Sequence, residues 1–220
     1  GIRPGDRVDV LGIPVVLSTN LIEATWDTGA YVQTSGVLKR IAVKLSKICN
    51  DLRLLSSGPR TGINEINLPR LQPGSSIMPG KVNPVIPEVV SQVAFDIIGK
   101  DVTITMAAEA GQLELNVMEP IIAFSLSNGI HRLRQAMRTL QDRCVSGITA
   151  NKERCRSMVE NSIGIITALN PYLGYETSAS IAKEALETGG SVIDIVLARN
   201  LLSREKLDDI LAPEHMINRK

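Results

Sequence analysis

The stretch GSSIMPGKVNP, residues 74–84, carries the side chains of this chain that are best suited to chemistry. Ser75 and Ser76 supply hydroxyl groups. Lys81 supplies a positive charge and Asn83 an amide. Two glycines let backbone N–H groups approach a ligand closely, and hydroxyls, amides and a cation at close quarters bind carboxylates well. The stretch therefore predicts a carboxylate site, with an ordinary flexible loop between helices as the alternative.

The same stretch is not a phosphate-binding P-loop. That motif requires four residues between its two glycines and a lysine followed by a serine or threonine. Here five residues separate Gly74 from Gly80, and Val82 follows Lys81. The preceding residues also do not predict a strand. Spacing, chemistry and context all exclude this reading.

Long helices are expected to hold the loop. We expect helices at about 20–56, 84–109 and 120–144, and apolar residues recur mostly three or four positions apart in the first of them. Helices of this length far exceed the average of about 11–12 residues. Glycines and prolines forbid a regular element in residues 57–83 between the first two segments, and a long loop of this kind is often functional. The pattern favours an all-α fold built on a long-helix bundle.

Two further regions flank this bundle. Residues 1–17 predict an irregular lead-in without β alternation. The C-terminal region predicts shorter helices at 152–161, 176–188, 192–199 and 204–211. We therefore expect two domains: residues 1–150, the bundle with the loop at 72–83, and residues 151–220, a small helical domain.

Composition and charge narrow the function classes. The chain of 220 residues is 44% hydrophobic with a net charge of +1, so neither nucleic acid nor a membrane is an expected partner. Cys49, Cys144 and Cys155 lack CxxC spacing and are expected to be reduced thiols of a cytoplasmic protein. His131 and His215 stand far from the cysteines, so no metal site is expected.

The order of residues in 74–84 resembles the signature loop of the aspartase/fumarase superfamily of lyases. GQLELNVMEP (111–120), GITANKERC (147–155) and SIGIITALNPYLGYE (162–176) extend the resemblance over essentially the whole chain, as the C-terminal half of such an enzyme. Residues 111–120 fit the branch that removes ammonia from aspartate better than the hydratase branch.

The resemblance implies a role for each polar residue of the loop. Ser75 would be the general base, acting as an alkoxide that Lys81 and backbone N–H groups stabilise. Ser76 would donate to the carboxylate that becomes the doubly charged aci-carboxylate intermediate. Lys81 and Asn83 would hold the other carboxylate. Glu88 would pair with a histidine from another segment, although it could instead interact only with the dipole of its own helix. This chemistry requires no cofactor, and a divalent activator stays open.

The resemblance also implies that each active site combines three segments from three subunits of a homotetramer. This chain matches only the segment with the signature loop, so we expect the 220 residues alone to be inactive. A fumarate hydratase or another lyase of the superfamily is the first alternative. A non-catalytic structural or assembly protein is the second.

Overall fold

The computed structural model describes residues 7–10, 12–72, 74, 78, 82–212 and 215. The chain divides into two compact units, Gly1–Thr149 and Ala150–Lys220. No helix in the described part of the chain combines the length and the apolar character needed to cross a membrane.

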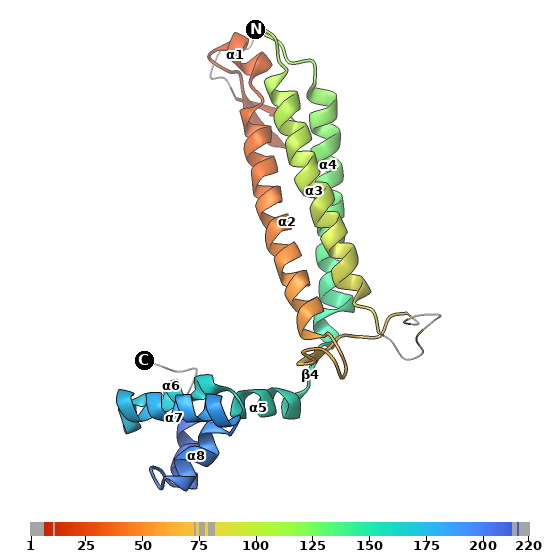
Figure 1. The fold of residues 1–220 in the computed structure, drawn as a ribbon. Helices are drawn as coiled ribbons and strands as arrows, with labels where there is room; N and C mark the ends of the chain where they lie inside the picture. Colours follow the sequence, from red (N-terminus) through yellow and green to blue (C-terminus); the bar gives the residue numbers. More distant parts are fainter. Residues whose placement is uncertain are drawn as a thin grey trace. The chain divides into compact units, whose positions relative to one another are not determined.

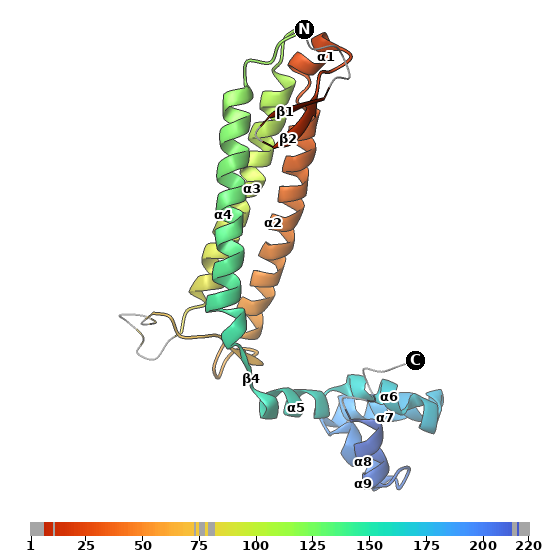
Figure 2. The ribbon, with the colours of Figure 1, turned by 180° about the vertical axis from the view of Figure 1, so that it is seen from behind.

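Three long helices dominate the first unit, which confirms the predicted all-α bundle. They are α2 (Gly29–Leu55), α3 (Val85–Glu109) and α4 (Glu119–Arg143). Figures 1 and 2 show them side by side, with α3 packed against both neighbours. Helices of 25 or 27 residues are about 38–40 Å long. The α2–α3 connection, which contains the signature loop, therefore lies at the opposite end from the α3–α4 connection.

The core of the bundle consists of three apolar clusters along the helices. A buried polar contact interrupts the apolar packing between α2 and α3. Asp101 of α3, only 6% exposed, accepts hydrogen bonds from the Ser35 hydroxyl (2.8 Å) and the Lys39 ammonium (2.6 Å) of α2. Burial alone would raise the pKa of Asp101, but the bonds from Lys39 and Ser35 outweigh it and hold that pKa below its ordinary value. This contact fixes the position of α2 along α3.

The first predicted helix is interrupted near its start. Asn20 caps α1 (Leu21–Trp26), and its Oδ1 accepts the N–H of Glu23 at 3.2 Å. The chain then leaves the helix at Asp27, whose Oδ1 accepts the N–H of Gly29 at 2.9 Å. Such a bond lets a short polar side chain compete with helical backbone bonds. The prediction of one continuous helix is therefore wrong at Asp27 and Thr28.

The N-terminal lead-in is also more regular than predicted. β1 (Arg7–Val10) pairs antiparallel with β2 (Ile13–Val16), with Val8 opposite Val15. Gly12 supplies the positive φ of +77° that the tight turn requires. The short runs VDV and IPVV are too brief for alternation to be recognised from sequence.

The connection between α3 and α4 is a tight turn organised by Asn116. This side chain is 2% exposed. Its Nδ2 donates to the Ala107 carbonyl at 3.0 Å, and its Oδ1 accepts the N–H of Met118 at 2.8 Å, so it links the end of α3 to the start of α4. Leu113 at the tip is 90% exposed with φ of +49°. A rigid turn thus presents an apolar side chain to the outside.

The second unit contains α5 (Lys152–Glu160), α6 (Ile166–Leu173), α7 (Tyr175–Thr188), α8 (Val192–Ala198) and α9 (Arg204–Ile210). Short 3₁₀ turns cover Val145–Gly147, in the first unit, and Ile163–Ile165. Ser191 and Ser203 cap α8 and α9 by accepting backbone N–H groups, and Gly189 ends α7 in the left-handed conformation. Sequence analysis missed α6, which contains Pro171.

Candidate active site

The two ends of the signature loop are joined by the Asn83 side chain. Its Nδ2 donates a hydrogen bond of 2.6 Å to the carbonyl oxygen of Gly74. Asn83 is half-buried and lies just before α3. Ser75, Ser76 and Lys81, the other predicted site residues, lie outside the described residues. The Asn83 side chain therefore joins Gly74 to the residues that lead into α3.

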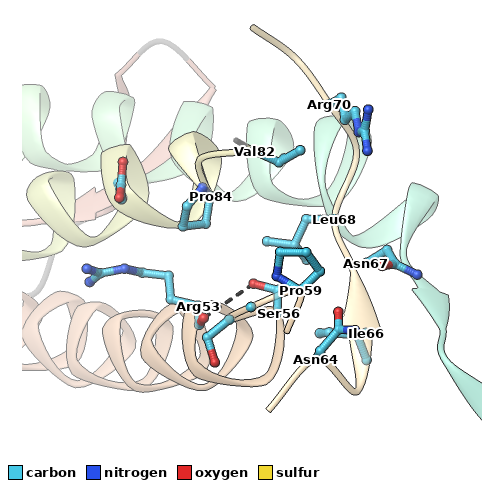
Figure 3. Close-up of a pocket in the computed structure, with 13 residues that line it drawn as sticks. Arg53, Ser56, Pro59, Asn64, Ile66, Asn67, Leu68, Arg70, Val82 and Pro84 are labelled. Atoms are coloured by element: carbon cyan, nitrogen blue, oxygen red, sulfur yellow. Dashed lines mark hydrogen bonds between the residues drawn. The ribbon is translucent and has the colours of Figure 1, made fainter. Parts of the chain in front are cut away.

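A cavity of about 450 Å³ lies beside the C-terminal end of the loop. Figure 3 shows Arg53 reaching it from α2, Pro84 from the start of α3 and Leu68 from the segment between these helices. Arg53 and Arg70 lie on opposite sides of this view. Residues 56–59 also line the cavity.

The turn at residues 56–63 gives the cavity a firm wall. The Ser57 hydroxyl donates to the Leu54 carbonyl at 2.6 Å and accepts the N–H of Ile63 at 3.1 Å. Only glycine fits at position 62, because an added Cβ would lie 2.4 Å from the carbonyl carbon of Ser57. This backbone is therefore set by local bonds before any ligand arrives.

Glu88 supplies the carboxylate of the described cavity lining. It lies one turn into α3, with its N–H bonded to the Pro84 carbonyl at 3.1 Å. Its side chain is half-buried and makes no ion pair with another described residue. A carboxylate at the start of a helix is favoured by the helix dipole. It is also free to orient a hydrogen-bond donor that enters the cavity.

Sequence reasoning missed Arg53, Asn64 and Arg70 as members of this site. Arg53 reads as an ordinary basic residue in the last turn of α2. Arg70 and Asn64 lie in the irregular segment, where no periodicity reveals which way a side chain points. The structure brings them to the same cavity as Glu88. The cavity thus combines one carboxylate with two cations.

The remaining candidates do not join this site. His131 lies on an exposed face of α4. Cys49, Cys144 and Cys155 form no disulfide with one another. Burial and the neighbouring Cys144 raise the pKa of Cys49 to about 11, so this thiol is unreactive at neutral pH. The described residues contain no cluster of His, Cys, Asp and Glu that could hold a metal ion.

Comparisons with known proteins assign the fold to a class. Residues 6–99 match the family described as Lyase, and residues 165–218 match the family described as Fumarase C C-terminus. The chain belongs to the aspartase/fumarase superfamily of lyases. The chain is 64% identical over 210 residues to the aspartate ammonia-lyase of Helicobacter pylori and 58% identical to that of Escherichia coli. Each alignment covers 96% of this chain, but the chain spans only about 45% of the length of these relatives.

Solved structures agree with this assignment. A fumarate lyase:delta crystallin from Brucella melitensis aligns with a TM-score of 0.87 at 55% identity, over 93% of this chain and 44% of that chain. A class II fumarase from Schistosoma mansoni aligns with a TM-score of 0.83 at 38% identity, over 94% and 44%. Both similarities extend over the bundle and the C-terminal unit.

Proposed function

We propose that the complete protein carrying this chain removes ammonia from L-aspartate to give fumarate. The observation that carries the proposal is the 64% identity, over 96% of this chain, to an aspartate ammonia-lyase. The loop motif supports it, because Ser75, Ser76, Lys81 and Asn83 are all retained. A purely structural role would not require two serines and a lysine in this order.

In the proposed reaction, the Ser75 alkoxide takes the proton from the carbon next to one carboxylate. The electron pair of that C–H bond moves into the carboxylate and forms the aci-carboxylate dianion. Donors from Ser76 and backbone N–H groups stabilise this charge, because their dipoles are oriented before it develops. Collapse of the dianion forms the C=C bond and breaks the C–N bond, which releases ammonia. The Ser75 proton then leaves to solvent.

The described residues support two positioning roles. An asparagine amide has two donor hydrogens. One bond from Asn83 to Gly74 leaves a second N–H for the substrate carboxylate that Lys81 neutralises. Glu88, beside the same cavity, orients a histidine supplied by another segment of the protein. No cofactor takes part in this scheme.

The proposed assembly is a homotetramer with shared active sites in the cytoplasm. Its support is the apolar outer face of the bundle. Phe95, Val102 and Met106 of α3 are 59–62% exposed, and Phe124 of α4 is 62% exposed. Large apolar side chains at this density on long helices require other helices to cover them.

An assay of ammonia release from L-aspartate tests the proposal. The complete protein should release ammonia from L-aspartate, and a Ser75→Ala variant should lose nearly all of this activity while keeping its fold. The isolated 220-residue chain should be inactive. Ammonia release unchanged by Ser75→Ala would contradict the mechanism.

A fumarate hydratase is the second candidate, favoured by the alignment with the class II fumarase from Schistosoma mansoni. The two functions are separated by product, since the hydratase would form malate from fumarate and release no ammonia from aspartate. If neither product forms, a structural role becomes the better explanation. The lower identity of 38% places the hydratase second.

A further inference from the structure

The segment that leads toward the signature loop is attached to the residues that follow α4. β3 (Ile66–Asn67) is hydrogen-bonded to β4 (Thr149–Ala150), and Thr149 is the last residue of the first unit. The Asn67 Nδ2 donates a hydrogen bond of 3.2 Å to the hydroxyl oxygen of Thr149. We call residues 66–69 the entry arm and residues 147–149 the exit segment.

Apolar packing adds to this hydrogen bond. Leu68 of the entry arm and Ile148 of the exit segment both pack against one buried cluster. Its members come from all three long helices and the residue after α4: Cys49, Val90, Ala136, Leu140 and Cys144. Figure 3 shows Asn67 and Leu68 on opposite sides of the arm. The arm is therefore seated on the end of the bundle by a polar side chain and an apolar one.

The two segments approach each other most closely at Gly147. A Cβ added there would lie 2.6 Å from Cγ of Pro69, whereas ordinary van der Waals contact begins at 3.4 Å. This Cγ belongs to a ring that closes on the backbone nitrogen, so it cannot swing aside as a flexible side chain does. Asn67 and Pro69 thus contact Thr149 and Gly147 in reverse order along the chain, and any side chain at position 147 would displace the arm.

The entry arm ends five residues before Gly74 in the sequence. The Gly74 carbonyl accepts the hydrogen bond from Asn83, at the start of α3. The chain between Pro69 and Gly74 is therefore fixed at both of its ends, by the exit segment and by Asn83. Ser75, the proposed base, directly follows Gly74. A displaced arm would pull on Gly74 and change the position of the residue beside it.

We propose that Gly147 and Thr149 are positioning residues of the signature loop, which act on the reaction through the entry arm without touching the substrate. This gives a role to the motif GITANKERC (147–155), which the carboxylate chemistry does not use. The effect on turnover rests on the proposed function, but the contact itself does not. Ser75 lies at the arm side of the loop and Lys81 nearer to α3 in the sequence, so a displaced arm should lower kcat more than it raises KM.

Ammonia release from L-aspartate by variants of the complete protein tests the role in turnover. Gly147→Ala should lower kcat about tenfold to a hundredfold, because a misplacement of about 1 Å has an effect of this size. Adding Pro69→Ala should restore most of the loss, because it removes the Cγ and leaves Cβ at 3.6 Å. Ser146→Ala is the matched control, since its hydroxyl bonds only within the same turn, to the Gln141 carbonyl, and kcat should not change. An unchanged kcat in Gly147→Ala, or no rescue by Pro69→Ala, would overturn the proposal.

Thiol labelling tests the contact without any activity. Cys49 and Cys144 are buried in the cluster on which Leu68 packs. N-ethylmaleimide should therefore label them faster in Gly147→Ala than in the native protein, with the labelled sites located by mass spectrometry. Adding Pro69→Ala should restore the protection, which general unfolding would not do. Equal labelling of Gly147→Ala and the native protein would overturn the contact. If the native protein releases no ammonia from L-aspartate, the proposed function fails, and the labelling still decides the contact.

A second pair of variants tests the arm without adding bulk, should Gly147→Ala not fold. Thr149→Val keeps the shape of the side chain and removes the acceptor of the Asn67 bond, so it should lower kcat a few-fold. In an Asn67→Ala background the same change should have no further effect, because the bond is already absent. Equal losses in both backgrounds would show that Thr149 does not act through the arm and would overturn its assignment.

Discussion

The two units of the chain bury their apolar side chains to very different degrees. The second unit closes one core of nine buried residues: Ile165, Leu169, Ile181, Ala185, Val192, Ile195, Val196, Leu207 and Ile210. The bundle leaves many large apolar side chains at least 41% exposed, among them Val37, Val43, Val89, Phe95, Val102, Met106, Ile121, Phe124 and Ile130. The helices of the second unit therefore close a core of their own, whereas the bundle leaves large apolar faces uncovered.

Helix length explains this difference. Helices of 7 to 14 residues joined by short turns can surround one core on several sides. Three helices of 25 to 27 residues that lie side by side can cover only the faces that they turn toward one another. The remaining faces stay apolar because other chains cover them in the proposed assembly.

The largest effect is expected from separating the units. Residues 150–220 alone should fold as a monomer with one cooperative thermal transition, because their core is closed. Residues 1–149 alone should self-associate or precipitate, because their outer faces are apolar. Sedimentation and circular dichroism of both pieces check this. A monomeric, stable bundle piece would contradict the expected difference between the two units.

The second-largest effect is expected from a substitution in the core of the second unit. Ile181 is completely buried, so Ile181→Ala should lower the free energy of unfolding of that unit by about 2–5 kcal/mol. Leu186→Ala, at a position that is 69% exposed in the same helix, should change it by less than about 0.5 kcal/mol. Urea unfolding of both variants gives the answer, and similar values for the two would deny that this core is closed.

In the bundle, loss of the buried Asp101 carboxylate should lower the free energy of unfolding more than loss of any surface ion pair. Asp101→Asn should cost roughly 1–3 kcal/mol at pH 7, because hydrogen bonds to a charged group are lost in a buried seam. The pKa of Asp101 is lowered, so its contribution is present above the ordinary value of 3.8 and is lost as pH falls through the folded pKa. The difference in the free energy of unfolding between the native chain and Asp101→Asn should therefore become smaller in acid.

The control for this prediction is Asp51→Asn. Asp51 pairs with Lys47 one turn away on the same helix, but both side chains are exposed. An exposed pair of this kind contributes only about 0.3–0.5 kcal/mol. Unfolding curves at pH 7 and at pH 3 for the three proteins separate the cases. A larger loss for Asp51→Asn than for Asp101→Asn would contradict the assigned roles.

Sequence reasoning predicted the long helices well because periodicity over 25 residues leaves little choice of structure. It failed where a few residues decide the backbone. The Asp27 carboxylate accepts the Gly29 N–H where α1 ends, and Gly12 forms the turn of the N-terminal hairpin. The sequence pattern also did not predict α6, in which Pro171 removes one backbone bond while Leu169 gains a fully buried position.

The residues of the candidate site also divide into those that the sequence predicts and those that it does not. The motif identified Asn83 and Glu88 by their order in the chain, since recognition of a loop depends only on local sequence. Arg53 and Arg70 could not be predicted from the sequence, because their place in the same cavity as Glu88 depends on how α2 and the irregular segment fold around it. Burial and direction in such a segment follow from tertiary contacts, which a single sequence does not display.

The smallest predicted effect concerns the caps of the second unit. Ser203 starts α9, and its hydroxyl oxygen accepts the N–H of Lys206 at 3.2 Å. Ser203→Ala should cost about 1 kcal/mol, because one backbone N–H at the helix start loses its partner. Ser203→Asp restores an acceptor and adds a charge that the helix dipole favours, so it should recover the loss. Thermal unfolding of the C-terminal unit resolves a change of this size. If the alanine and aspartate variants melt together, the cap does not contribute, and the closed core alone explains the stability of this unit.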